Sequence, residues 1–250
     1  APELDPKNLG PNAPAYPLFD EQTLIDGDKS IEYVDSASTI STPEQLNRFG
    51  TLSMSWQPQH GDLTVHRIEI LRGGQRIDLL KNGLGFTVLR REAGLESQII
   101  DGRLTAVRQI EGLRIGDVLR MAFSVSVADS LLGGKAQTGI LLIPKPTKIG
   151  FGRARLVWPK AQNIAWKVMM PGIAEKPKAI AGGRMELSVP MPVVAMPELP
   201  KDAPARFRSI PVISATTFAG WGEVSSVMAP LYRTEGTIAE GSDLAKAVDA

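Results

Sequence analysis

The side chains that most often perform chemistry are scarce in this chain. It has no cysteine and only 2 histidines, His60 and His66. The absence of cysteine excludes a thiolate nucleophile, a disulfide and a thiolate metal site. Two histidines and a carboxylate could hold a metal ion, but no spacing selects such a set, and we expect both histidines to be ordinary surface or hydrogen-bonded residues. Neither a metal nor a cofactor is predicted.

Other catalytic motifs are equally weak. No Gly-x-Ser-x-Gly run is present, so the common nucleophile turn of serine hydrolases is missing. Residues 83–85 and 150–152 read Gly-x-Gly without the further residues of phosphate-binding loops, and we interpret them as turns or bulges. With 27 acidic residues, some carboxylates must lie close together, but the sequence cannot choose a pair. We therefore regard a hydrolase that uses buried carboxylates as the weakest functional hypothesis for this chain. The other two, an accessory domain and a binding module, are described below.

Four residues are candidates for binding rather than catalysis. Asp101 and Arg103 flank a glycine in a predicted hairpin turn. The aspartate has a structural reason to be there, whereas the arginine could make a bidentate contact with a carboxylate or a partner domain. Trp221 lies on a predicted amphipathic helix near the C-terminal end, and Tyr232 follows it. The other tryptophans lie in apolar patterns, which favour core packing.

The elements that must position these side chains are strands. Over residues 65–134, alternating apolar residues and turn signals follow each other without a helix. Gly73-Gly74 and Asp101-Gly102 are two-residue hairpin signals. The alternation is cleanest over residues 119–127, where Phe123 lies on the apolar face and is expected in the core. The sequence therefore predicts an all-β fold, a large antiparallel β-sandwich of many strands.

A proline-rich arm and two helices complete the predicted organisation. Five prolines fall within the first 17 residues, which favours an extended arm over a ladder strand. Thr42-Pro43-Glu44-Gln45 has the features of a capping box and predicts a short helix over 43–49. Apolar residues from Phe218 to Leu231 recur at helical spacing and predict a C-terminal helix. We divide the chain into an extended arm (1–30), a β-sandwich accessory domain (31–214) and a helical connector (215–250).

An ordered series of short motifs resembles one known family. The motifs are Arg72-Gly73-Gly74, Arg90-Arg91-Glu92, Leu95-Glu96, residues 98–105 and 112–119, residues 130–134, Trp158-Pro159, residues 218–221 and Leu231-Tyr232-Arg233. In this order they resemble DUF3857, the N-terminal domain of unknown function of bacterial transglutaminase-like proteins. The resemblance covers residues 31–233.

The resemblance implies a non-catalytic accessory domain that precedes a transglutaminase-like catalytic domain in an exported bacterial protein. It also implies a periplasmic or secreted location, with the signal peptide removed. The connector would lead towards the catalytic domain, and the apolar stripe that contains Trp221 would pack partly against it. A hypothesis from another class is a free-standing secreted module that binds a glycan or a peptide through a face of the sandwich.

The composition excludes some partners. The formal net charge is +1, which gives no basis for binding nucleic acid. No apolar run approaches the roughly 20 residues that a membrane-spanning helix needs.

Overall fold

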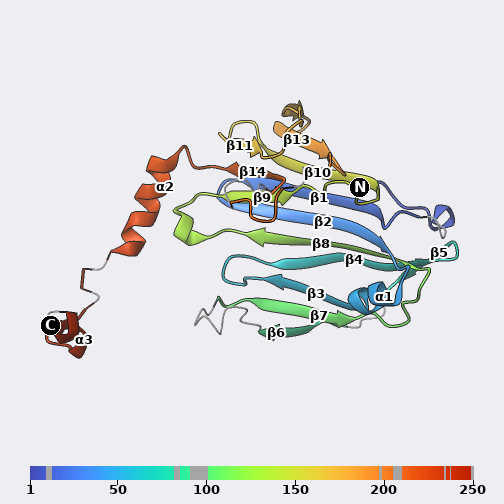
Figure 1. The fold of residues 1–250 in the computed structure, drawn as a ribbon, viewed down its shortest axis with the longest axis horizontal. Coiled ribbons are helices and arrows are strands. Elements are labelled where there is room, and N and C mark those ends of the chain that lie inside the picture. The colour runs from blue at the N-terminus through green and yellow to red at the C-terminus, as the bar shows by residue number, and fades with distance from the viewer. Residues whose placement is uncertain are drawn as a thin grey trace.

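The computed structural model describes residues 1–9, 13–81, 85–90, 101–196, 199–204, 210–233, 235–236 and 238–248. Strands dominate this part of the chain (Figure 1). They are β1 (Tyr16–Asp26), β2 (Lys29–Thr39), β3 (Thr51–Trp56), β4 (Leu63–Arg72), β5 (Gln75–Asp78), β6 (Thr87–Arg90), β7 (Leu104–Gln109), β8 (Val118–Val127), β9 (Gln137–Leu141), β10 (Ile149–Pro159), β11 (Ala165–Val168), β12 (Lys178–Ile180), β13 (Arg184–Pro190) and β14 (Val212–Thr216). The α-helices are α1 (Pro43–Phe49), α2 (Trp221–Met228) and α3 (Asp243–Val248), and the 3-10 helices include η1 (Pro6–Asn8), η3 (Ser130–Leu132) and η5 (Ala229–Tyr232).

The strands form three sheets. The large sheet has eight strands in the order β12-β13-β10-β1-β2-β8-β4-β5. The β9 sheet has the order β11-β14-β9, and the β7 sheet has the order β3-β7-β6. Among the described strands, only β1 and β10 pair in parallel. The predicted all-β fold is confirmed, and the parallel pair is an addition that the alternation could not reveal.

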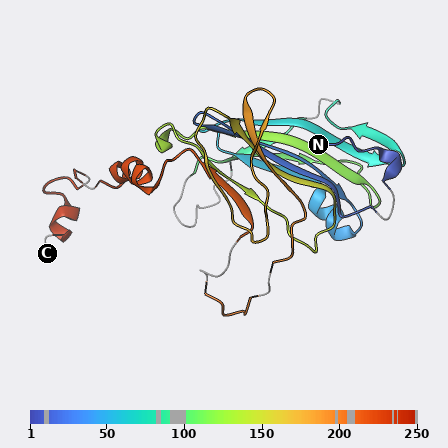
Figure 2. The ribbon, with the colours of Figure 1, turned by 90° about the horizontal axis from the view of Figure 1, so that it is seen from above.

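Two apolar clusters attach the small sheets to one face of the large sheet. The first joins β10 and β13 to the β9 sheet, and its fully buried members include Leu156, Leu187, Ile140 and Ile213. The second joins β4 and β8 to the β7 sheet and includes Ile68, Leu119 and Leu52, with the partly buried Leu46 of α1 packed against it. Figure 2 shows the layers from above, with α2 and α3 extending away from them. Burial of apolar area against the large sheet therefore holds both small sheets.

The opposite side of the large sheet, the charged face, carries a row of ion pairs. At its centre Arg120, 1% exposed, donates from Nε and Nη2 to the Asp35 carboxylate at 3.0 and 2.8 Å. Arg153 donates to Asp20 at 2.9 and 2.8 Å. Burial would raise the pKa of Asp20, but Arg153 and the N-terminal ammonium of Ala1, 3.0 Å away, together hold the pKa below its usual value. The row continues through Arg155, which is paired with Glu186.

Residues 1–9 lie against the charged face. The Glu3 carboxylate is 3.1 Å from Arg67 Nη1 and 3.2 Å from Arg120 Nη1. The Leu4 carbonyl accepts a hydrogen bond from Arg76 Nη2 at 2.9 Å. Leu4 and Leu9 pack on a small apolar cluster, which consists of Leu18, Ala37, Leu71 and Val118. Residues 1–9 therefore pair with arginines of the charged face and also cover its small apolar cluster, which the strands by themselves would leave exposed to solvent.

The prediction of an extended arm over residues 1–30 needs a correction. Residues 16–26 form β1, an interior strand of the large sheet that pairs with both β2 and β10. Its middle reads Asp-Glu-Gln-Thr, a polar run that does not resemble an interior strand. It is tolerated because Asp20 is paired with Arg153 and the Gln22 amide oxygen accepts from Arg155.

Two further sequence predictions differ from the structure. Phe123 is only half-buried, and the large side chain buried in β8 is Arg120 on the face assigned as polar. Gly150 and Gly152, interpreted as turn or bulge residues, lie inside β10. A Cβ atom at these positions would come within 2.7 Å of the Pro17 carbonyl oxygen and 2.4 Å of the Met191 carbonyl oxygen. The glycines therefore permit close backbone approach rather than a turn.

The local signals were more reliable. Thr42 caps α1, its hydroxyl accepts from the Gln45 N–H, and the Gln45 side chain accepts from the Thr42 N–H in return. Gly73 and Gly74 have φ of 55° and 77° in the turn that joins β4 to β5, as the predicted hairpin requires. The Asp101-Gly102 signal precedes β7, but residues 91–100 before it lie outside the described part of the chain.

Replacing Arg120 should be among the most destabilising single changes in the large sheet. Arg120→Met leaves the Asp35 carboxylate, 3% exposed, without its buried counter-charge, which should cost about 3–5 kcal/mol of unfolding free energy. Arg103→Met is the matched control, because it removes an ion pair whose arginine is 45% exposed and should cost less than about 1 kcal/mol. Urea unfolding monitored by circular dichroism measures both, and equal losses would contradict the importance of the buried pair.

Candidate functional site

A groove lies on the outer face of the β9 sheet, and we call it the β9 groove. Its volume is about 780 Å³, within the range of small-ligand sites. The lining residues come from β9, β11 and β14 and from the segment that leads into α2. They are Gln137, Thr138, Gly139, Ala165, Ser214, Ala215, Thr216, Phe218, Ala219, Gly220, Trp221 and Val224.

Strand alternation builds the floor of the groove. Ile213 and Ala215 of β14 point into the first apolar cluster, so Ser214 and Thr216 point outwards. Gly139 of β9 lies opposite Ser214, and Ala165 of β11 lies opposite Thr216. These side chains are all small, and the floor is therefore flat and accessible over all three strands.

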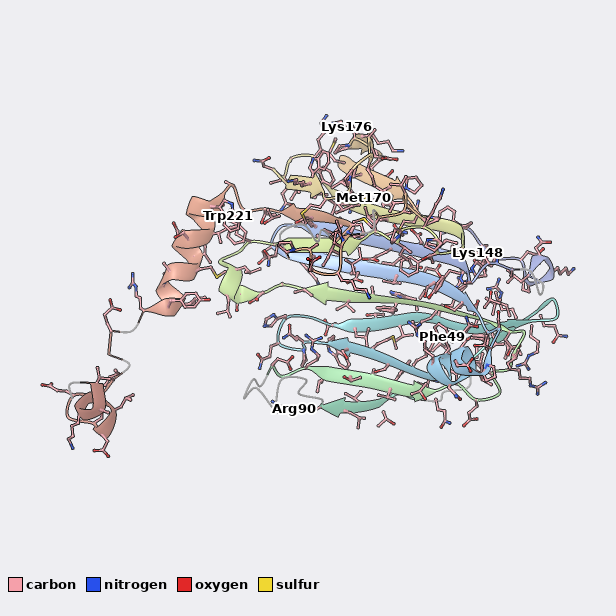
Figure 3. The ribbon with its side chains drawn as sticks, viewed as in Figure 1. Phe49, Arg90, Lys148, Met170, Lys176 and Trp221 are labelled. Carbon is pink, nitrogen blue, oxygen red and sulfur yellow. The ribbon has the colours of Figure 1, made fainter. Side chains whose placement is uncertain are left out.

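The wall of the groove is the N-terminal end of α2. Phe218, 6% exposed, anchors the segment before the helix. Glu223 accepts from the Ala219 N–H at 2.7 Å, and its other oxygen is 2.5 Å from Lys135 Nζ. These contacts hold the first turn of α2 beside the sheet, where Figure 3 shows Trp221 at the end of the helix nearest the strands.

The four residues predicted to bind are not brought together. Asp101 and Arg103 pair with each other at 3.2 Å beside β7, and the Arg103 N–H donates to the same carboxylate at 3.0 Å. This arrangement is a local turn, as the structural interpretation of Asp101 required. Trp221 and Tyr232 belong to α2 and η5, and are 86% and 80% exposed. Only Trp221 lines the groove.

Sequence reasoning missed the floor of the groove. Gln137, Ser214 and Thr216 belong to no motif, and their neighbours along the chain are ordinary strand residues. The available signal was the alternation of Ile213 and Ala215 with small polar residues, which indicates a strand with one solvent-facing side. It could not show that β9, β11 and β14 would form one sheet.

A pair of carboxylates lies on the inner face of the large sheet. Glu21 of β1 is opposite Val34 of β2, and Glu32 of β2 is opposite Thr23 of β1, so the two acids are diagonal neighbours. Burial, with the nearby charge of Glu32, raises the pKa of Glu21 to about 7. Glu21 can therefore hold or release a proton near neutral pH. Within the described ranges, no group of three or more histidine or acidic side chains could hold a metal ion.

Comparison with known proteins places the chain in context. A family model described as a domain of unknown function with solved structure, DUF3857, matches residues 27–190. A solved structure of a proposed protease from Parabacteroides distasonis has a TM-score of 0.68 and 14% sequence identity. The match covers 89% of this chain and 44% of that chain, so this chain spans less than half of the length of that protein. Identity at this level shows a shared fold alone. No curated protein matches the sequence.

The raised pKa of Glu21 predicts a specific pH dependence of stability. Its folded pKa of about 7 lies above the ordinary value of 4.5, so the folded state keeps the proton longer than the unfolded state. The free energy of unfolding therefore does not depend on Glu21 ionisation below the unfolded pKa. It falls as the pH rises from the unfolded pKa through the folded pKa. Between pH 5 and 8 the wild-type protein should lose about 1–3 kcal/mol relative to Glu21→Gln.

Urea melts of both proteins at several pH values test this expectation. The exposed Glu240→Gln variant is the control and should follow the wild-type curve. Parallel curves for wild type and Glu21→Gln would show that Glu21 titrates normally.

Proposed function

The chain belongs to the DUF3857 family, and from this premise we propose that it is a non-catalytic accessory domain of an exported, periplasmic or secreted bacterial protein. Its partner would be a transglutaminase-like catalytic domain in the same polypeptide. The similarity to part of a much longer proposed protease supports this, since the shared fold accounts for 44% of that chain. The accessory domain would position the catalytic domain or present its substrate.

The observation that carries the proposal is the exposed C-terminal segment. None of the residues of α2, η5 or α3 that the structure describes is buried. Leu231 and Tyr232 of η5 are 53% and 80% exposed, and Leu244 of α3 is 59% exposed. Figure 1 shows this segment projecting from the sheets. Apolar residues grouped on short helices are normally covered by a partner, and a domain joined to these helices is a suitable one.

The chemistry agrees with an accessory role. The chain has no cysteine, so a thiolate nucleophile cannot come from it. In the proposed protein the catalytic domain supplies the nucleophile, and the present chain supplies a rigid β-sandwich. No helix in the described segments is both long and apolar enough to cross a membrane.

Hydrogen exchange tests the proposed docking. In the product of the complete gene, backbone amides of η5 and α3 should exchange more slowly than in the 250-residue chain. Leu231→Ser with Tyr232→Ser should restore fast exchange and speed proteolysis between the domains. Ile115→Ser is the matched control, since Ile115 is as exposed as Leu231, at 53%, but lies before β8. Equal exchange in the long and short proteins would contradict the docking surface.

An activity assay tests whether the nucleophile belongs to the proposed catalytic domain rather than to this chain. The 250-residue chain should show no amide hydrolysis or crosslinking that iodoacetamide inhibits, because it has no thiol to alkylate. The product of the complete gene should show such activity. A complete gene product that contains no cysteine would overturn the proposed partner.

A further inference from the structure

The β9 groove has polar groups that the fold does not use. Within the described residues, no hydrogen bond engages the outward-facing side chains of Gln137 or Ser214. Thr216 differs, since its hydroxyl donates to the Ala136 carbonyl at 3.1 Å and accepts from the Phe218 N–H at 3.2 Å. One hydroxyl and one amide on the outer face of the sheet therefore remain available to a ligand, and each can both donate and accept.

Trp221 gives the groove an exposed aromatic surface. Its side chain is 86% exposed, although a tryptophan in water forgoes a large hydrophobic gain. The backbone that carries it is held beside the sheet, because Glu223 accepts from the Ala219 N–H and pairs with Lys135. An exposed indole offers a flat apolar surface with a negative π-face, which suits the weakly positive C–H groups on one face of a sugar ring.

The lining indicates the charge of the ligand. None of the twelve residues that line the groove is ionisable. A charged ligand would lose hydration there without gaining a counter-charge. A purely apolar ligand would leave the hydroxyl and amide groups of the floor unpaired. A neutral ligand with many hydroxyl groups and apolar ring faces satisfies both conditions.

We propose that the β9 groove binds a neutral oligosaccharide, with one sugar ring stacked on Trp221 and its hydroxyl groups bonded to Gln137 and Ser214. The small side chains of Gly139 and Ala165 leave space for a flat chain of rings across the three strands. This inference does not depend on the proposed catalytic partner, because every residue of the groove belongs to this chain.

Isothermal titration calorimetry of the 250-residue chain with three neutral hexasaccharides, of cello-, malto- and chito-type, tests the proposal. We expect one of them to bind with an affinity in the micromolar to millimolar range. Trp221→Ala should weaken that binding at least about tenfold, as expected for an aromatic anchor, and Trp221→Phe should recover part of it. Ser214→Ala should also weaken binding, because it removes the hydroxyl from the floor without adding bulk.

Tyr232→Ala is the matched control, because Tyr232 is a similarly exposed aromatic residue that does not line the groove. It should bind like wild type. The proposal is overturned if none of the three hexasaccharides binds at millimolar concentration, if Trp221→Ala binds as well as wild type, or if a neutral Ala-Ser-Gly peptide binds more tightly than all three sugars. None of these results bears on the docking of η5 and α3, which the exchange experiment measures separately.

Discussion

The ion pair between Arg120 and Asp35 is the constraint on which the large sheet depends. Both side chains are almost completely buried, and each satisfies the charge of the other. A slip of β8 by one residue would turn Arg120 into the apolar cluster below and place Leu119 among charges. The pair therefore selects the register of β8 against β2, at a position where apolar packing alone would tolerate alternatives. Arg120 also attracts Glu3, so the same charge brings residues 1–9 onto the sheet.

This arrangement divides the large sheet into two chemically different sides. The inner side carries the two small sheets on apolar clusters, and the charged face is satisfied by cross-strand ion pairs and by residues 1–9. The β9 sheet uses its inner side for packing, which leaves its outer side open to solvent. Surfaces available for binding consequently lie on the outer layer and on the helices that follow it, rather than on the sheet that holds the fold together.

Local signals in the sequence predicted the elements well, whereas long-range pairing was beyond them. The capping residues around Thr42 and the glycine pair at 73–74 act within a few residues, so their outcome was readable. The polar run in β1 was misleading, because its burial depends on Arg153 and Arg155 far along the chain. The groove was unpredictable for the same reason, since three separated strands build its floor. Trp221 was identified as a binding candidate from its place on an amphipathic helix, but its neighbours across the groove were not.

The parallel pairing of β1 with β10 affects how the chain can assemble. β1 and β2 are joined by the tight turn at Gly27 and can form a hairpin at once. The other edge of β1 can pair only after β10 has been synthesised, because the two strands are far apart in the sequence. The contact of Asp20 with Arg153, for example, spans 133 residues. Pairing over such separations is slow, and an unpaired strand edge can meanwhile recruit other chains. The edge of β1 that faces β10 therefore remains unpaired until residues 149–159 have been synthesised and inserted, and this edge is the part of the large sheet that folding must protect.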